Sequence, residues 1–250
     1  MKVYLSRFVC SSFEINLKNF EREVERSIEK GAEIVVFPEI FLTGYCQKPS
    51  AFKIENAFKK NSREFPKTLF VFGTYTKNEK NRLTVWYDGD EVAYYEKIHL
   101  FYPNKEDKIW KVGNFYSALN FKGKKIGFLI CNDIRFPEGA RELKLKLGID
   151  LLIIVAWWPL RRDHIWKKLL QVRAIENGIW VVGCCISSSV YEKEKFSGAL
   201  NYAFDPEGNQ ILTDDDSTYE ILNKKIKILV DTKKEYKEIK EFKIFKIEKA

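Results

Sequence analysis

Apolar runs and an amphipathic stretch alternate near the N-terminus of the chain. The run KVYLSRFV, residues 2–9, has the length and composition of a β-strand, and EIVVFPE, residues 33–39, is a short continuous apolar run typical of a strand buried on both faces. Between them, residues 16–31 predict a helix that ends at Gly31. Its apolar face consists of Leu17, Phe20, Val24 and Ile28. Strand, helix and strand in this order form a βαβ unit, so we expect a sheet that is at least partly parallel.

The middle of the chain is rich in strand patterns. Residues 68–76, 82–100 and 115–131 contain apolar and β-branched runs interrupted by turn signals. The turns are Asp88-Gly89-Asp90 and Lys122-Gly123, both typical of hairpins. This part of the chain therefore predicts antiparallel strands that extend the sheet.

Two further helix–strand pairs follow. Residues 136–148 and 162–178 have helical patterns, and the apolar runs 149–158 and 179–189 come directly after them. Residues 198–212 predict a hairpin through Pro206-Glu207-Gly208. We find no linker and no internal repeat, so we expect one domain over residues 1–250, with a lysine-rich tail at about 230–250 that has no clear pattern. Helices that alternate with buried strands predict an α/β layered fold.

Composition excludes several classes of protein. With 45% hydrophobic residues, the chain has the composition of a globular protein. No run approaches about 18 apolar residues, and the start of the chain lacks the apolar core of a signal peptide, so we expect no membrane span and a cytoplasmic location. The net charge of +8 comes from lysines interleaved with glutamates, as in EREVERSIEK, which is typical of solvated helix faces rather than of nucleic-acid binding.

Cysteine and histidine usage narrows the chemistry. The five cysteines show no CxxC spacing, which predicts free thiols in a reducing compartment. The two histidines, His99 and His164, have no metal-binding spacing, and no GxSxG motif is present. We therefore expect neither a zinc site nor a Ser-His-Asp triad.

Three ionisable residues stand directly after apolar runs: Glu39, Lys97 and Cys131. In open α/β sheets, ligands bind beyond the carboxyl ends of the strands, so these residues are expected to converge. Their chemistry is complementary, because a cysteine attacks as thiolate, a carboxylate can move its proton, and an ammonium stabilises an oxyanion. Each also has an ordinary explanation: a cysteine in the core, a glutamate that caps a loop, and a lysine that flanks a strand.

The sequence segments around these three residues resemble those of a known family. FPEIFLTGY, EKIHLF and GFLICNDIRFPE closely resemble, in order and spacing, the three signatures of the nitrilase superfamily of carbon–nitrogen hydrolases, and the resemblance extends from about Val3 to about Leu212. It implies that Glu39, Lys97 and Cys131 form a catalytic triad in an amidohydrolase that needs no metal and no organic cofactor. NKEDKIWKVGN is similar to the family's loop with a second glutamate, here Glu106, whose alternative is a solvent-exposed glutamate in a charged loop.

The resemblance also implies architecture. It implies a four-layer α-β-β-α sandwich with Cys131 at a sharp strand-to-helix turn, and a homodimer or a dimer-based homo-oligomer. A helix that starts near Phe136 would direct its N–H groups toward the cysteine, which favours a thiolate. The family commonly has an aromatic residue after the cysteine, where this chain has Asn132, whose backbone N–H is the implied second oxyanion donor.

Residues 156–185 look much like bacterial omega-amidases that act on 2-oxoglutaramate. The implied reaction is hydrolysis of the terminal amide of a small carboxylic acid to the acid and ammonia. An arginine is the natural partner of the substrate carboxylate, although each candidate could instead be held in a structural ion pair. The candidates are Arg135, Arg161 and Arg162. Trp157 and Trp158 are expected to line the pocket or to belong to the core.

Other readings of the same residues stay open. A nitrilase or an N-carbamoyl hydrolase would have the same triad, and a binding protein on this scaffold would need no catalysis. Leu200 and Asn201 depart from the family's small residues in a loop that often borders the pocket. The sequence leaves open which amide is cleaved, which arginine binds it, the oligomeric state beyond a dimer-based assembly, and the role of the tail.

Overall fold

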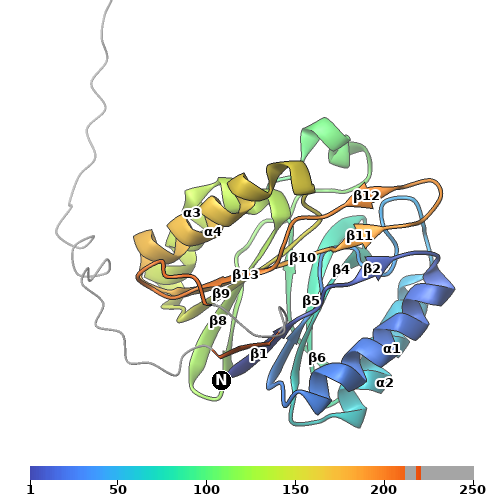
Figure 1. The fold of residues 1–250 in the computed structure, drawn as a ribbon, viewed down its shortest axis with the longest axis horizontal. Helices are drawn as coiled ribbons and strands as arrows, with labels where there is room; N and C mark the ends of the chain where they lie inside the picture. The colour runs from blue at the N-terminus through green and yellow to red at the C-terminus, as the bar shows by residue number, and fades with distance from the viewer. Residues whose placement is uncertain (212–217, 221–250) are drawn as a thin grey trace, which may run out of the picture.

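Two β-sheets stacked face to face form the centre of the protein, and helices cover both outer faces (Figure 1). The computed structural model describes residues 1–211 and 218–220. The first sheet has the order β14 (Thr218–Glu220), β1 (Lys2–Leu5), β3 (Ile34–Val36), β4 (Leu69–Lys77), β5 (Lys80–Tyr87) and β6 (Asp90–Glu96). The second has the order β13 (Tyr202–Phe204), β10 (Trp180–Cys185), β9 (Leu151–Ala156), β8 (Lys124–Ile130) and β7 (Ala118–Phe121).

Helices α1 (Phe13–Glu29) and α2 (Ala51–Glu64) cover the first sheet, and α3 (Pro137–Glu142) and α4 (Asp163–Asn177) cover the second (Figure 1). A small third sheet joins β12 (Phe196–Ser197), β11 (Ser188–Ser189) and β2 (Val9–Cys10). The architecture is a single-domain α-β-β-α sandwich, so the predicted fold class is confirmed.

The parallel strands lie where the apolar runs predicted them. Strands β1, β3 and β4 are parallel neighbours in the first sheet, and β8, β9 and β10 are parallel neighbours in the second. All residues of β3 and β9 are buried, because a sheet covers one face of each strand and a helix layer or the other sheet covers the opposite face. The carboxyl ends of these strands therefore offer rigid positions for side chains.

Both expected hairpin turns are present. Asp88 and Gly89 have φ of 50° and 84°, and Lys122 and Gly123 have φ of 49° and 76°, which is the left-handed conformation that two-residue hairpins require. The hairpin after β13 also forms, since Phe204 and Gln210 are bridge partners.

Other details of the structure differ from the sequence expectation. Helix α2 was not predicted, although Ile54 and Phe58 are one turn apart and buried. The run at residues 2–9 divides into β1 and the start of β2, which pair with different sheets. The helix expected at 136–148 is α3 followed by a π-helical turn, Leu143–Leu147. The lysine-rich tail at 230–250 lies outside the described residues.

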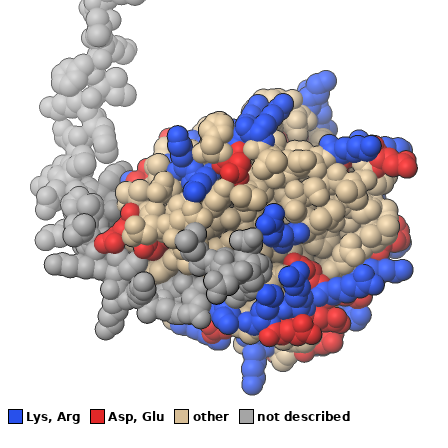
Figure 2. All heavy atoms as spheres, viewed as in Figure 1, with Lys and Arg blue, Asp and Glu red and all other residues tan. Residues whose placement is uncertain are grey.

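The surface mixes charges of both signs on the face that Figure 2 presents, in agreement with the interleaved sequence pattern. Exposed pairs such as Lys60–Glu21, 2.8 Å apart, illustrate this mixing. Within the part of the chain that the structure describes, no helix is long and apolar enough to cross a membrane.

Candidate active site

Lys97 lies immediately after β6 and is completely buried between two carboxylates. Its Nζ is 2.8 Å from Glu39 Oε1, 3.0 Å from Glu106 Oε1 and 2.9 Å from Glu106 Oε2. Both glutamates are also fully buried. A buried charge is tolerated only when it is paired and hydrogen-bonded, so these three side chains depend on one another.

Glu39 follows β3 and is held at both oxygens. Oε1 accepts hydrogen bonds from Lys97 Nζ and from Asn81 Nδ2, the latter at 2.9 Å. Oε2 accepts one from the backbone N–H of Trp157, at 2.8 Å, which follows β9 of the second sheet. The carboxylate thus joins the carboxyl ends of strands from both sheets, as expected for this kind of fold.

A glycine in β4 makes room for the turn that carries Glu39. Gly73 has φ of 56° within an irregularity of the β4–β5 pairing, and a Cβ placed there would lie 1.9 Å from the carbonyl oxygen of Pro38. One residue further on, Thr74 Oγ1 accepts a hydrogen bond from the backbone N–H of Ile40, at 2.9 Å. Strand β4 therefore fixes the backbone on both sides of Glu39.

Gly73→Ala is expected to lower the free energy of unfolding by about 3 kcal/mol, the upper end for overpacking, and to reduce activity by displacing Glu39. Gly123→Ala is the matched control, because Gly123 also has positive φ, of 76°, but no atom lies within 4 Å of its added Cβ. Urea unfolding of both variants measures the difference. Equal losses of stability would show that the contact with Pro38 is unimportant.

Glu106 begins the 3-10 helix Glu106–Lys108 and is buried, so its alternative as a solvent-exposed glutamate is wrong. Besides Lys97, it accepts hydrogen bonds from Tyr45 Oη and from the backbone N–H of Phe101, both at 2.8 Å. Tyr45 and Phe101 were not singled out by the sequence, although Tyr45 ends the motif FPEIFLTGY. Two contacts with Lys97 and one each with Tyr45 and Phe101 fix the orientation of the Glu106 carboxylate.

Cys131 stands at a sharp turn, as expected. It follows β8 directly, has φ of 47°, and begins the 3-10 helix Cys131–Arg135. Asp133 closes the turn by accepting hydrogen bonds from the backbone N–H groups of Ile130, at 3.0 Å, and His99, at 2.8 Å. The thiol Sγ lies 3.8 Å from the carbonyl oxygen of Trp157. Positive φ is uncommon for a non-glycine residue; in this chain it also occurs in the hairpin turns at Asp88 and Lys122, whereas at Cys131 it occurs at a candidate nucleophile.

The electrostatic balance keeps the resting cysteine protonated. Burial, and next the Glu39 carboxylate, raise the pKa of the Cys131 thiol well above its usual value, although Lys97 opposes them. The helix expected near Phe136 is present as α3, which begins at Pro137 with Phe136 as its N-cap. Its thiolate-favouring effect stays a prediction, since burial and Glu39 are the largest influences on the thiol and raise its pKa. A base is needed to remove the thiol proton.

Lys97 and Glu106 respond to the same surroundings in different ways. Burial would lower the pKa of Lys97, but the Glu39 and Glu106 carboxylates, together with Cys131 when it is ionised, outweigh burial and raise that pKa. Burial raises the pKa of Glu106, with Lys97 acting in the opposite direction. Lys97 therefore stays charged and can stabilise a developing negative charge.

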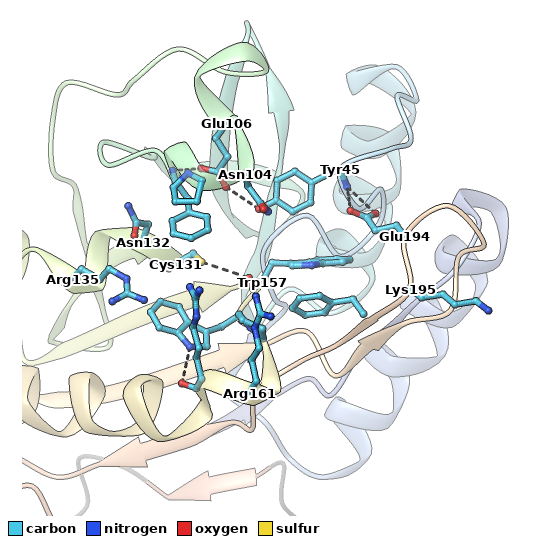
Figure 3. Close-up of a pocket in the computed structure, with 16 residues that line it drawn as sticks. Tyr45, Asn104, Glu106, Cys131, Asn132, Arg135, Trp157, Arg161, Glu194 and Lys195 are labelled. Carbon is cyan, nitrogen blue, oxygen red and sulfur yellow. Dashed lines mark hydrogen bonds between the residues drawn. The ribbon is translucent and has the colours of Figure 1, made fainter.

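A cavity of about 420 Å³ opens beside these residues (Figure 3). Cys131, Glu106 and Asn132 line it, and so do the two tryptophans that the sequence analysis named, Trp157 and Trp158. This volume is in the range of small-molecule sites. Within residues 1–211 and 218–220, no group of three or more histidine, cysteine, aspartate or glutamate side chains could hold a metal ion.

Three arginines line the same cavity: Arg135, Arg161 and Arg162. The Arg135 guanidinium carbon lies 4.6 Å from the centre of the Trp158 ring, and the side chain extends toward the cavity on the side of Cys131 (Figure 3). None of the three forms a salt bridge within the described part of the chain, so the alternative of structural ion pairs finds no support there. By contrast, Lys195 points away from the cavity (Figure 3).

The residues that depart from the family pattern have structural roles. The Asn132 side chain donates to the carbonyl oxygens of His99 and Leu100, both at 3.2 Å, and so fixes the segment after Lys97. Asn201 accepts from the backbone N–H of Cys185 and donates to the carbonyl oxygen of Leu5, which ties the two sheets together. Neither Leu200 nor Asn201 is among the residues that line the cavity.

Glu194 also lines the cavity and was not anticipated. Both of its carboxylate oxygens lie 3.1 Å from the backbone nitrogen of Tyr45 (Figure 3). Gly44 permits this approach, since a Cβ there would lie 2.1 Å from Glu194 Oε2. The segment before β12 is thereby attached to the loop that follows Glu39.

Comparisons with known proteins agree with this geometry. The sequence profile of the family described as "Carbon-nitrogen hydrolase" matches residues 5–209. Omega-amidase YafV of Escherichia coli K12 is 32% identical over 176 residues, which cover 68% of this chain and 67% of that protein. The 2-oxoglutaramate amidase of Bacillus subtilis is 30% identical over 207 residues, which cover 76% and 79% of the two chains.

Solved structures of low sequence identity share the fold. Nit3 of Saccharomyces cerevisiae, described as a member of branch 10 of the nitrilase superfamily, has a TM-score of 0.73 at 23% identity, with 84% of both chains covered. An amidase from Nesterenkonia sp. has a TM-score of 0.74 at 22% identity, again with 84% of both chains covered. The predicted family and enzyme class are both confirmed: the chain belongs to the carbon–nitrogen hydrolase family of the nitrilase superfamily and is an amidohydrolase.

Proposed function

We propose that this enzyme hydrolyses the terminal amide of a small carboxylic acid, such as 2-oxoglutaramate, to the acid and ammonia. One observation carries the proposal: the buried Lys97 ammonium is fixed between Glu39 and Glu106 beside a cavity that Cys131 lines. Base, cation and nucleophile are the groups that acyl transfer requires. The bacterial relatives named as omega-amidases support the choice of an amide.

In the proposed mechanism, Glu39 removes the Cys131 thiol proton as the sulfur attacks the amide carbon. Lys97 and the backbone N–H of Asn132 stabilise the tetrahedral oxyanion; Asn132 is the second residue of a 3-10 helix, where backbone N–H groups have no partner within the helix. Glu39 then gives the proton to the departing ammonia, and a thioester remains on Cys131. Water, activated by Glu39 with Glu106 assisting, releases the acid.

The arginines at the cavity suggest that the substrate carries a carboxylate in addition to its amide. A guanidinium recognises a carboxylate through paired hydrogen bonds, and Arg135 is half-buried, stacked on Trp158 and four residues after Cys131. Burial, and next the neighbouring Arg162, lower the pKa of Arg135, so an anion that binds there would relieve a repulsion between like charges. We propose Arg135 as the main carboxylate partner and Arg161 and Arg162 as further cations at the cavity wall.

Arg135→Lys is expected to lower kcat/KM by about 10–100-fold for an amide that carries a carboxylate, since a hydrogen bond to a charged group contributes about 1.5–3 kcal/mol. A neutral amide of the same length should lose no more than about twofold. Arg141→Lys, in α3 and outside the cavity, is the matched control. Equal losses for both substrates would refute the role of Arg135 in carboxylate binding.

The function itself is tested by ammonia release from a panel of omega-amides, N-carbamoyl amino acids and nitriles. The proposal predicts turnover of omega-amides and at least about tenfold lower kcat/KM for the other two classes. Preference for a nitrile or a carbamoyl compound would move the enzyme to another branch of the family. The homodimer and the cytoplasmic location stay predictions, and light scattering of the purified protein tests the first.

A further inference from the structure

Glu39 has a second side-chain partner besides Lys97. Asn81, near the start of β5, is completely buried, and its Nδ2 donates to Glu39 Oε1 at 2.9 Å. The backbone carbonyl oxygen of the same residue accepts the backbone N–H of Lys97, at 3.0 Å. One asparagine therefore contacts both members of the buried ion pair.

The Asn81 side chain has no other polar contact within the described residues. Its Oδ1 is buried and has no donor among them, so the bond to Glu39 is its one hydrogen bond there. Turning the amide around would place Oδ1 against the Glu39 carboxylate, which cannot donate when ionised. The amide orientation is therefore determined by Glu39. Buried polar atoms usually all have hydrogen-bond partners, so a purely structural role does not explain why a buried asparagine with an unpartnered Oδ1 among the described residues stands here.

The chemistry gives this contact a purpose. Lys97 has three N–H donors and already meets both glutamates, and the proposed mechanism asks it to donate to an oxyanion as well. If Lys97 turns toward the substrate, its hydrogen bond to Glu39 Oε1 weakens. A neutral donor on the same oxygen keeps the carboxylate in place without adding a charge to the site.

Among the described residues, Oε2 of Glu39 accepts a hydrogen bond only from the backbone N–H of Trp157, whose carbonyl oxygen lies 3.8 Å from Cys131 Sγ. The two carboxylate oxygens thus have different surroundings: Oε1 has two side-chain donors, whereas Oε2 has a backbone donor from Trp157, the residue that the thiol also contacts. This difference suits Oε1 for anchoring the carboxylate and Oε2 for accepting the proton.

We propose that Asn81 is a positioning residue that anchors Glu39 Oε1, so that Oε2 faces the Cys131 thiol throughout the reaction. This inference rests on the proposed function, because it assigns Glu39 the role of base. Asn81 is not among the residues that line the cavity, so it acts through Glu39 and is not a catalytic residue.

The test combines activity with a pH profile of ammonia release. Asn81→Ala is expected to lower kcat/KM by about 10–100-fold, the scale of a misplaced reacting group. The acidic limb of its profile should move to higher pH, because removing a donor from an ionised carboxylate favours the protonated form. Among the described residues, the titratable groups that interact electrostatically with Glu39 are Tyr45, Lys97, Glu106, Cys131 and Cys185, and all are retained.

Asn177→Ala is the matched control. Asn177, in α4, is equally buried and also has an Oδ1 without a donor among the described residues, but it bonds to the carbonyl oxygen of Arg173, away from Glu39. Its pH profile should match that of the unmodified enzyme, whatever its effect on the melting temperature. If Asn81→Ala does not fold, Asn81→Ser, which retains a donor group, replaces it, with a smaller shift of the limb in the same direction.

The outcomes separate the two proposals. An acidic limb that stays in place in the Asn81 variant, with an activity loss no larger than that of Asn177→Ala, overturns the positioning role while leaving the proposed function intact. Absence of ammonia release by the unmodified enzyme, or full activity of Cys131→Ala, overturns the proposed function itself.

Discussion

Cys131→Ala is expected to abolish amide hydrolysis, with a loss in kcat of about 10⁴-fold or more, because removal of a nucleophile leaves only binding and oxyanion stabilisation. The fold should persist, since alanine tolerates the backbone about as well as cysteine does, and the one hydrogen bond of the thiol among the described residues is a long contact of 3.8 Å to Trp157. Ammonia assays and thermal unfolding of the same preparation measure both effects.

Cys184→Ala serves as the control for loss of a buried thiol. Cys184, in β10, is as deeply buried as any cysteine of the protein, and its Sγ contacts the carbonyl oxygens of Ser6 and Val36 rather than the cavity. We expect a lower melting temperature and an activity within about threefold of the unmodified enzyme, because the effect is on packing alone. Comparable activity losses in the two variants would mean that Cys131 acts structurally.

Lys97→Ala is expected to lose both activity and stability. Without the ammonium, Glu39 and Glu106 face each other as buried carboxylates without a cation, and breaking a buried ion pair costs about 3–5 kcal/mol. The loss in kcat should exceed the 10²–10³-fold that removal of one oxyanion donor typically causes, since the charge also tunes both carboxylates. Urea unfolding and steady-state kinetics measure the two losses.

The pH dependence of this stability has a definite sign. The pKa of Lys97 is raised in the folded protein, so its contribution is fully present below the usual lysine pKa and is lost as the pH rises through the folded value. Lys80→Ala is the control, because Lys80 pairs with Glu96 at 2.6 Å but is partly exposed, and we expect a cost of only about 0–1 kcal/mol. An equally small cost for Lys97→Ala would contradict the account of a buried, interdependent site.

The sequence predicted the strand ends well because parallel strands follow a simple rule. Apolar runs locate β3 and β8, and a polar residue directly after such a run must lie at the sheet edge, as Glu39 and Cys131 do. Helix α2 was missed because only Ile54 and Phe58 mark its apolar face among many lysines and glutamates. Periodicity could not show how many layers the elements build, which came from the family resemblance.

The partners of the site could not be predicted because they come from distant segments. Glu106 lies in a highly charged loop, and only its contacts with Tyr45, Lys97 and Phe101 explain why it is buried. Asn81 carries no local signal at all, since its role depends on the pairing of β5 with its neighbours. The arginines could be named from the sequence, but their lack of salt bridges among the described residues required the structure.

The central claim is that amide cleavage passes through an acyl-thioester on Cys131, and partitioning with hydroxylamine tests it most directly. Hydroxylamine competes with water for the intermediate and yields a hydroxamate. The account predicts one ratio of hydroxamate to acid for an amide and for the methyl ester of the same acyl group, because both give the same thioester after the leaving group departs. A ratio that depends on the leaving group, or turnover that yields no hydroxamate, would contradict it.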